Sequence, residues 1–174
     1  MLYREKGRAP RPFCHFATDF HNTNTLLKDG QMTAPNTALT ITGLLETSLY
    51  VDDMARAVLF YEQVLHLPCM QRGEVLSVFD AGRQGVLLLF KRGASKADRP
   101  NSHGVVPGHD GSGPLHMAFA IPAESYQPWL HHLQTESVPF RGEMTWPAGG
   151  RSLYFEDPDG HLLEFATPGL WPNY

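Results

Sequence analysis

A single carboxylate interrupts an apolar stretch near the end of the chain. The segment DPDGHLLEF, residues 157–165, runs from a tight Asp-Pro-Asp-Gly turn into a short apolar strand that contains Glu164. Burying an unpaired carboxylate is costly, so such a residue normally loses its charge or finds a partner. The sequence offers two kinds of partner for Glu164: a basic side chain such as Arg151, or a metal ion held together with other ligands.

Two further polar residues occupy comparable positions in predicted strands. Glu46 lies in GLLETSLYV and His116 in GPLHMAFAIP, and each comes five residues before the last apolar position of its strand. Carboxylate oxygens and neutral imidazole nitrogens are common ligands of divalent cations. Glu46, His116 and Glu164 therefore predict a metal site. The alternatives are a solvated Glu46 at a sheet edge and a core histidine at position 116 that bonds to the backbone.

The elements that must position these residues occur twice along the chain. From residue 41 the pattern reads strand, helix and then further strands, and the same order returns in the second half. Alternating apolar residues mark the strands, and apolar residues at helical spacing mark one helix in each half. We therefore predict an α+β fold of two tandem βαβββ modules, residues 41–92 and 114–168, within one domain, 41–174. Their curved mixed sheets form a cleft, and a Gly- and Pro-rich loop, residues 93–113, joins them.

Superposition of the two halves aligns the polar positions. Placing LLETSLYV on PLHMAFAI puts Glu46 on His116, and placing GVLLLF on GHLLEF puts Leu89 on Glu164. Equivalent places in a repeated unit predict that Glu46, His116 and Glu164 meet in the cleft. Leu89 would fill the fourth equivalent position without binding anything. His161, three residues before Glu164, is predicted to point to the other face of the sheet.

Residues 1–40 are predicted to be a poorly structured N-terminal extension. They include basic residues but no apolar segment of the kind found in secretory signals, and they show no sustained periodicity. Two interpretations compete: a loosely ordered extension, or sequence upstream of a true start at Met32. We favour the second, because MTAPNTALTITG would make an ordinary beginning.

Composition limits the classes of partner. The 174 residues are 42% hydrophobic and 18% charged, with a net charge of -4. No segment reaches the ~18 uninterrupted apolar residues of a membrane span, and the charge gives no basic face for nucleic acid. The two cysteines, Cys14 and Cys69, match neither a disulfide framework nor a structural zinc site. We therefore expect a cytoplasmic protein with no membrane or nucleic-acid partner.

Three stretches resemble the vicinal-oxygen-chelate superfamily, which includes glyoxalase I, extradiol dioxygenases, fosfomycin-resistance thiol transferases and bleomycin-resistance proteins. They are LETSLYVDDMARAVLFYEQVLHL, GPLHMAFAI and GGRSLYFEDPDGHLLEF, and they span nearly all of residues 41–168. The DPDG sequence followed by xxLE is the most specific signal. The resemblance implies a glyoxalase/bleomycin-resistance-like fold and a divalent metal, which we do not rank among Mn, Fe, Zn, Ni and Mg. It also implies a homodimer, with a site that several members share between subunits.

This sequence departs from the patterns of the known members. The family usually has a metal-binding His where Glu46 stands, and this change weakens the interpretation as a ring-cleaving dioxygenase. Leu89 replaces a ligand of glyoxalase I, so that activity on its usual substrate is not expected. The ligands at positions 46, 116 and 164 resemble the fosfomycin-resistance pattern, although the His-to-Glu change again breaks a close match.

Other residues are predicted to complete the site. His103 and His109 lie on the long loop, where a lid histidine could act as general acid or base, or where both could simply be solvated. His109 could also reach the metal. The predicted catalytic residues are His109 and Tyr154, and the predicted walls of the substrate pocket are Tyr50, Trp146 and Arg151.

Two functions follow as hypotheses. The first is a metal-dependent enzyme in which the cation binds two neighbouring oxygens of a small substrate and stabilises the negative charge that develops. Dioxygenation, isomerisation or lyase chemistry, and thiol addition all fit, whereas no nucleophile elbow, P-loop or dinucleotide fingerprint occurs. The alternative is a metal-free protein that binds a small molecule or antibiotic and so confers resistance. Three potential ligands occurring together count against that alternative.

Overall fold

The computed structural model describes residues 39–174, and the compact unit considered below spans residues 42–174. The predicted extension, residues 1–40, falls almost entirely outside this range. The proposed start at Met32 and the position of Cys14 also lie outside the described residues.

The first module forms a four-stranded sheet with one helical segment. Strand β1 is parallel to β4, and the remaining neighbours are antiparallel, in the order β1-β4-β3-β2. Asp53 caps the helix by accepting a hydrogen bond from the backbone N–H of Arg56 at 3.0 Å. The elements are β1 (Glu46–Val51), α1 (Met54–Leu59), a π-helical continuation (Phe60–Val64), β2 (Cys69–Gln71), β3 (Leu76–Asp80) and β4 (Val86–Lys91).

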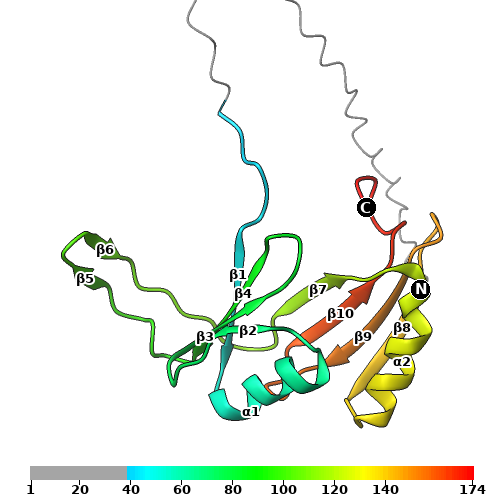
Figure 1. The fold of residues 1–174 in the computed structure, drawn as a ribbon, viewed down its shortest axis with the longest axis horizontal. Helices are drawn as coiled ribbons and strands as arrows, with labels where there is room; N and C mark the ends of the chain where they lie inside the picture. Colours follow the sequence, from blue (N-terminus) through cyan, green and yellow to red (C-terminus); the bar gives the residue numbers. More distant parts are fainter. Residues whose placement is uncertain (1–38) are drawn as a thin grey trace, which may run out of the picture. The chain divides into compact units, whose positions relative to one another are not determined.

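The second module repeats this arrangement. Its sheet has the order β7-β10-β9-β8, with β7 parallel to β10 and the other neighbours antiparallel. The elements are β7 (His116–Ala120), a 3-10 turn (Ala123–Ser125), α2 (Tyr126–Thr135), β8 (Phe140–Thr145), β9 (Arg151–Glu156) and β10 (Leu162–Ala166). The predicted α+β fold of two tandem βαβββ units is confirmed (Figure 1).

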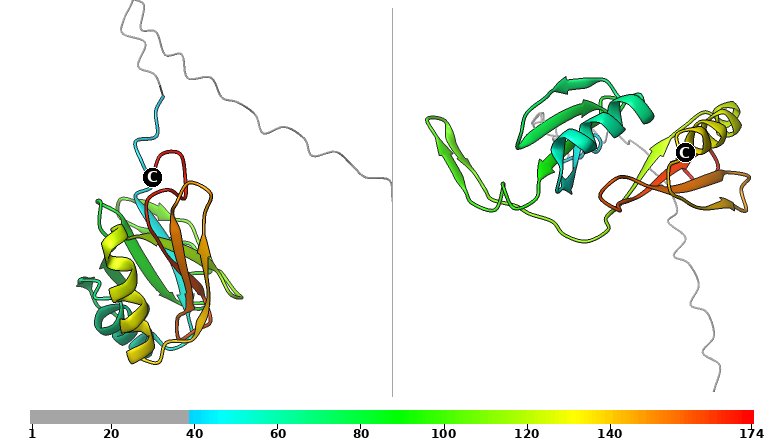
Figure 2. Two further views of the ribbon diagram at one scale, coloured as in Figure 1. Left: turned by 90° about the vertical axis from the view of Figure 1, so that its right-hand side faces the viewer. Right: turned by 90° about the horizontal axis from the view of Figure 1, so that it is seen from below.

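The segment between the modules contains a hairpin that the sequence did not predict. Strands β5 (Arg99–Asn101) and β6 (Gly104–Val106) pair only with each other and extend away from both four-stranded sheets (Figures 1 and 2). All six residues are exposed, so no apolar alternation marks these strands in the sequence.

The apolar faces of both sheets pack into one core. Alternate residues of each strand point to opposite faces of its sheet. The core side therefore holds Leu49 and Val51 of β1, while Glu46, Ser48 and Tyr50 point to the other side. In β10 the core residues are those on either side of Glu164. Glu46, Tyr50 and Glu164 thus lie on the faces that do not form the core.

Strand pairing shows that the predicted equivalence of Leu89 with Glu164 is wrong by one residue. Glu164 lies beside Ala118, and Leu88 lies beside Ser48. Ser48 and Ala118 are equivalent positions of the first strands of the two modules, so the counterpart of Glu164 is Leu88. A shift of one residue moves every side chain to the opposite face of a strand.

The error has an identifiable cause in the two hairpins. Val86, directly after Gly85, already belongs to β4, whereas His161 stands between Gly160 and the first residue of β10. Aligning the two glycines therefore displaces the strands by one position. Leu89 is fully buried in the core, where a carboxylate at the same position would have no partner.

Candidate metal centre

Two of the predicted ligands, His116 and Glu164, lie together on neighbouring strands. The Nε2 atom of His116 is 3.4 Å from Oε2 of Glu164, and the Glu164 side chain is only 5% exposed. The other carboxylate oxygen, Oε1, is buried without a hydrogen-bond partner. Among the described residues Glu164 forms no ion pair with a lysine or arginine. Its negative charge is therefore poorly compensated in the isolated chain.

The second ring nitrogen of His116 fixes how the imidazole is presented. Nδ1 lies 3.0 Å from the carbonyl oxygen of Leu162. A carbonyl can only accept, so we assign the proton of the neutral ring to Nδ1. The lone pair of Nε2 then points toward the carboxylate of Glu164. Metal-binding histidines are typically held this way, with the non-binding nitrogen donating to a carbonyl or carboxylate.

Tyr154 lies directly opposite Glu164 on β9, and its ring centroid is 6.4 Å from that of His116. Burial raises the pKa of the Tyr154 hydroxyl, and the Glu164 carboxylate adds to this increase. Tyr154 therefore keeps its proton near neutral pH. It can donate a hydrogen bond beside the two candidate ligands.

The two predicted pocket walls of this module lie on different faces. The indole Nε1 of Trp146 donates to the Ser152 hydroxyl at 2.8 Å, and Ser152 shares a strand face with Tyr154. This hydrogen bond holds the indole of Trp146 on the sheet face that carries Glu164. The guanidinium of Arg151 instead lies 3.5 Å above the ring centroid of Tyr126. Arg151 is therefore not the partner of Glu164, and its role in a pocket stays a prediction.

Tyr50 and His109 form a second polar pair, on the first module. The Tyr50 hydroxyl is 2.7 Å from Nδ1 of His109, whose ring meets Phe90 edge-on at 4.6 Å between centroids. Burial, and secondarily Asp110, raise the pKa of Tyr50, so its hydroxyl keeps its proton near neutral pH. His103 lies elsewhere, at the exposed turn between β5 and β6.

Glu46 does not complete a three-ligand group within one chain. It is exposed at the first position of β1 and lines a hollow of about 350 Å³, whose opposite wall is β7, beginning at His116. Between residues 39 and 174, no three His, Cys, Asp or Glu side chains gather closely enough to hold a metal ion. A larger hollow of about 630 Å³ beside α1 contains none of the predicted site residues.

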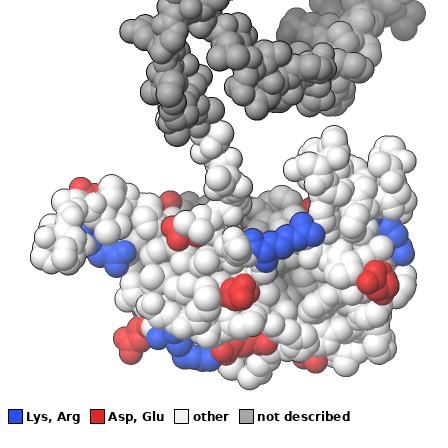
Figure 3. All heavy atoms as spheres, turned by 45° about the horizontal axis from the view of Figure 1, so that its top comes forward, with Lys and Arg blue, Asp and Glu red and all other residues white. Residues whose placement is uncertain are grey.

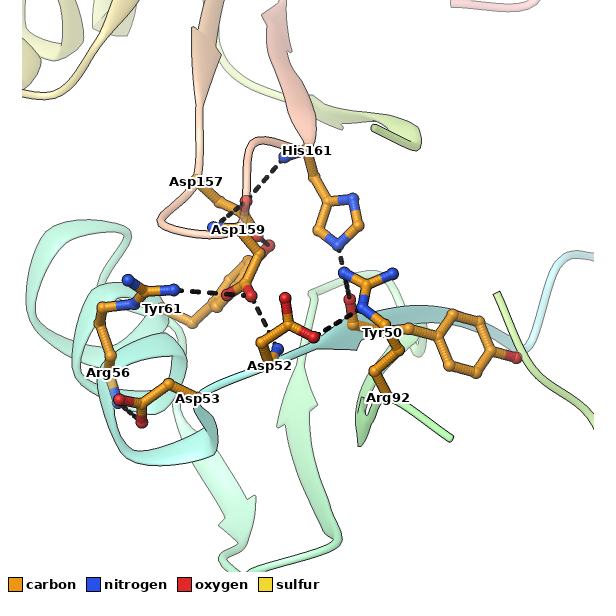
Figure 4. A network of polar contacts seen from close by, with 9 residues as sticks. All are labelled: Tyr50, Asp52, Asp53, Arg56, Tyr61, Arg92, Asp157, Asp159 and His161. Carbon is orange, nitrogen blue, oxygen red and sulfur yellow. Dashed lines mark hydrogen bonds and ion pairs between the residues drawn. The ribbon is translucent and has the colours of Figure 1, made fainter. Parts of the chain in front are cut away.

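The DPDG turn that marks the sequence joins the two modules (Figure 4). Asp157 accepts a hydrogen bond from the Tyr61 hydroxyl at 2.8 Å, and Asp159 accepts one from the backbone N–H of Asp52 at 2.7 Å. His161, at the end of the turn, was predicted to point to the other face of the sheet. It precedes β10, and its ring is fully buried, with Nε2 3.0 Å from the carbonyl oxygen of Tyr50 on β1.

Charge is dispersed on the face of the described residues that Figure 3 displays. Blue Lys and Arg side chains alternate there with red Asp and Glu side chains, without forming a continuous basic surface. No helix among the described residues is long and apolar enough to cross a membrane.

Paired βαβββ modules with a histidine–glutamate pair on the face that does not form the core define a class of proteins. Residues 43–165 match the family model of the Glyoxalase/Bleomycin resistance protein/Dioxygenase superfamily. The chain belongs to this superfamily.

Its relatives include metallothiol transferases and a lyase. Metallothiol transferase FosB of Staphylococcus epidermidis is 25% identical over 131 residues, which cover 75% of this chain and 84% of that protein. The enzyme of the same name from Lysinibacillus sphaericus is 26% identical over 121 residues, 69% of this chain and 78% of that protein. The crystal structure of lactoylglutathione lyase from Agrobacterium tumefaciens superposes with a TM-score of 0.69 at 28% identity, covering 76% of this chain and 98% of that one. The fosfomycin resistance protein FosX from Listeria monocytogenes gives a TM-score of 0.56 at 21% identity, over 75% and 97% of the respective chains.

Proposed function

We propose that this protein is a metal-dependent enzyme in which His116 and Glu164 hold a divalent cation. The observation that carries the proposal is the buried carboxylate of Glu164, which has one oxygen without a partner and the other beside the lone pair of His116. A cation would compensate that charge and accept that lone pair. One imidazole and carboxylate oxygens suit Mn, Fe, Zn, Ni or Mg.

The third ligand in this proposal is Glu46 from a second copy of the chain. Two observations support a shared site: Glu46 is exposed at the start of an edge strand, and the described residues of one chain contain no three-ligand group. The first module of one copy would then face the second module of the other. A homodimer would hold two such sites.

The reaction that we propose is thiol addition or a lyase step on a small substrate with neighbouring oxygens. Support comes from the relatives, which include metallothiol transferases and a lactoylglutathione lyase. The cation would supply binding of those oxygens and stabilisation of the negative charge that develops on them.

The chain's own residues would position the substrate and handle protons. Tyr154 retains its proton and would donate a hydrogen bond to a substrate oxygen, while Trp146 would form an apolar wall. The contact with the Tyr50 hydroxyl engages Nδ1 of His109 and leaves Nε2 of the ring for a substrate. His109, from the first module of the facing copy, would form a hydrogen bond with the substrate through Nε2.

Elemental analysis of protein purified without chelator tests the metal centre. We expect close to one divalent cation per chain in the wild type and none in Glu164→Gln, with Glu143→Gln, a carboxylate that pairs with Arg151, as the control. The reaction is tested by incubating the metal-loaded protein with fosfomycin and low-molecular-weight thiols and measuring thiol loss. A wild type that takes up none of Mn, Fe, Ni or Zn would favour the metal-free binding protein instead.

A further inference from the structure

We infer that His161 is a positioning residue for the candidate metal centre. The buried contacts of His161 fix the position of the beginning of β7 relative to β1 of the first module. They thereby also fix the ring of His116, the first residue of β7. This inference rests on the proposed function, because it treats His116 as a ligand.

Both ring nitrogens of His161 are used, although the side chain is completely buried. Nε2 lies 3.0 Å from the carbonyl oxygen of Tyr50, and the backbone N–H of Leu115 donates to Nδ1 at 3.1 Å. One contact requires a donor and the other an acceptor, so the ring is neutral with its proton on Nε2. A buried polar side chain with both of its bonds satisfied specifies one arrangement of the groups that it joins.

A continuous series of hydrogen bonds runs from His161 to His116. After the bond from Leu115 N–H to His161, the carbonyl of Leu115 accepts from Leu162 N–H at 2.8 Å. The carbonyl of Leu162 then accepts from Nδ1 of His116 at 3.0 Å. Residues 161 and 162 thus hold residues 115 and 116 through three successive bonds, and the last of these orients the candidate ligand.

The place of β7 in the sheet explains why this restraint matters. β7 is an edge strand whose single neighbour is β10, and its residues alternate between exposed and half-buried. His116 is its first residue, with a side chain 51% exposed, so core packing does not fix the ring. The hydrogen bonds made by His161 and Leu162 therefore restrain the His116 ring, which packing leaves free to move.

Only the module that holds His116 and Glu164 has this residue. In the first module Gly85 is followed at once by the first residue of β4, so no side chain occupies the equivalent place. The same turn contains a contact that holds the modules without touching β7, the bond from Tyr61 to Asp157 (Figure 4). Tyr61→Phe is therefore a matched control for the merely structural effect of loosening the turn.

The test measures Co²⁺ binding, with the visible absorption of the bound ion as a report on ligand geometry. His161→Leu is expected to lower Co²⁺ affinity about tenfold and to alter the spectrum at saturation, a loss typical of residues behind metal ligands. His161→Gln, whose amide can donate and accept, should recover most of this affinity while remaining below the wild type. Tyr61→Phe should lower the urea midpoint while leaving the Co²⁺ affinity and spectrum unchanged.

Equal affinity and an unchanged spectrum in His161→Leu would overturn the positioning role, because His161 would then support the fold alone. If His161→Leu does not fold, the comparison passes to His161→Gln and Tyr61→Phe, and equal Co²⁺ affinities in these two variants would overturn the inference. Absence of Co²⁺ binding by the wild type is a separate result. It would overturn the proposed function, and this inference with it.

Discussion

The imidazole of His116 lies between two oxygens, with Nδ1 3.0 Å from the carbonyl of Leu162 and Nε2 3.4 Å from the carboxylate of Glu164. The first contact requires a proton on Nδ1, so the neutral ring turns a lone pair toward a carboxylate. A lone pair and a carboxylate repel each other unless a positive charge lies beside them. In this arrangement either a proton or a metal cation supplies that charge, and the two outcomes can be distinguished.

The substitution Glu164→Gln should abolish the part of the unfolding free energy that depends on bound metal and leave the metal-independent part intact. With Mn²⁺ at 100 times its Kd, we expect the wild-type free energy of unfolding to rise by about 2.7 kcal/mol. Glu164→Gln should show no such rise, and without metal it should be at least as stable as the wild type, because an uncompensated buried charge is gone. Urea unfolding with EDTA or with Mn²⁺ measures both quantities. An equal Mn²⁺ effect in the two proteins would contradict a ligand role for Glu164.

Mixing two inactive variants tests whether the site is shared. Glu46→Ala and Glu164→Ala should each lose the bound cation. A mixed dimer would pair the intact Glu46 of one copy with the intact Glu164 of the other, so it should regain one site of two. Metal analysis after joint unfolding and refolding measures this recovery. Failure of the mixture to regain metal, when both variants fold and the wild type binds the cation, would place all ligands in one chain.

The corrected strand alignment makes a prediction about stability. Leu89→Ala should cost about 3 kcal/mol, because it leaves a cavity in the shared core. Leu88→Ala should cost about 1 kcal/mol, because Leu88 is only half-buried on the opposite face. Urea midpoints of the two variants provide the comparison. A larger loss of stability in Leu88→Ala than in Leu89→Ala would support the alignment in which Leu89 is the equivalent of Glu164.

Alkaline pH should destabilise the second module through Tyr126. Burial, and then the hydrogen bond to Glu143, raise the pKa of Tyr126 to about 12. The folded chain therefore keeps a proton that the unfolded chain loses near pH 10, so this contribution is complete below pH 10 and declines as the pH approaches about 12. Tyr126→Phe should show a shallower fall of the unfolding free energy across that range. An identical slope in both proteins would contradict the assignment.

Several features of the fold and the site follow from local sequence. Alternation and helical spacing predict the two βαβββ modules, and the turn chemistry of DPDG predicts the hairpin before β10. The pairing of His116 with Glu164 is predictable because the first and last strands of one module are neighbours in its sheet. The hairpin β5–β6 escapes prediction because its exposed residues carry no apolar pattern.

The sequence by itself determined the elements, their repetition and the residue types of the candidate site, because these depend on periodicity and side-chain chemistry. Only the tertiary structure decided the alignment of the modules, which depends on a single residue in one hairpin. It also decided that Arg151 packs on Tyr126 rather than on Glu164, and that His161 joins the two modules. Such contacts link residues far apart in the chain, and their geometry is set by how whole sheets pack, which no local pattern records.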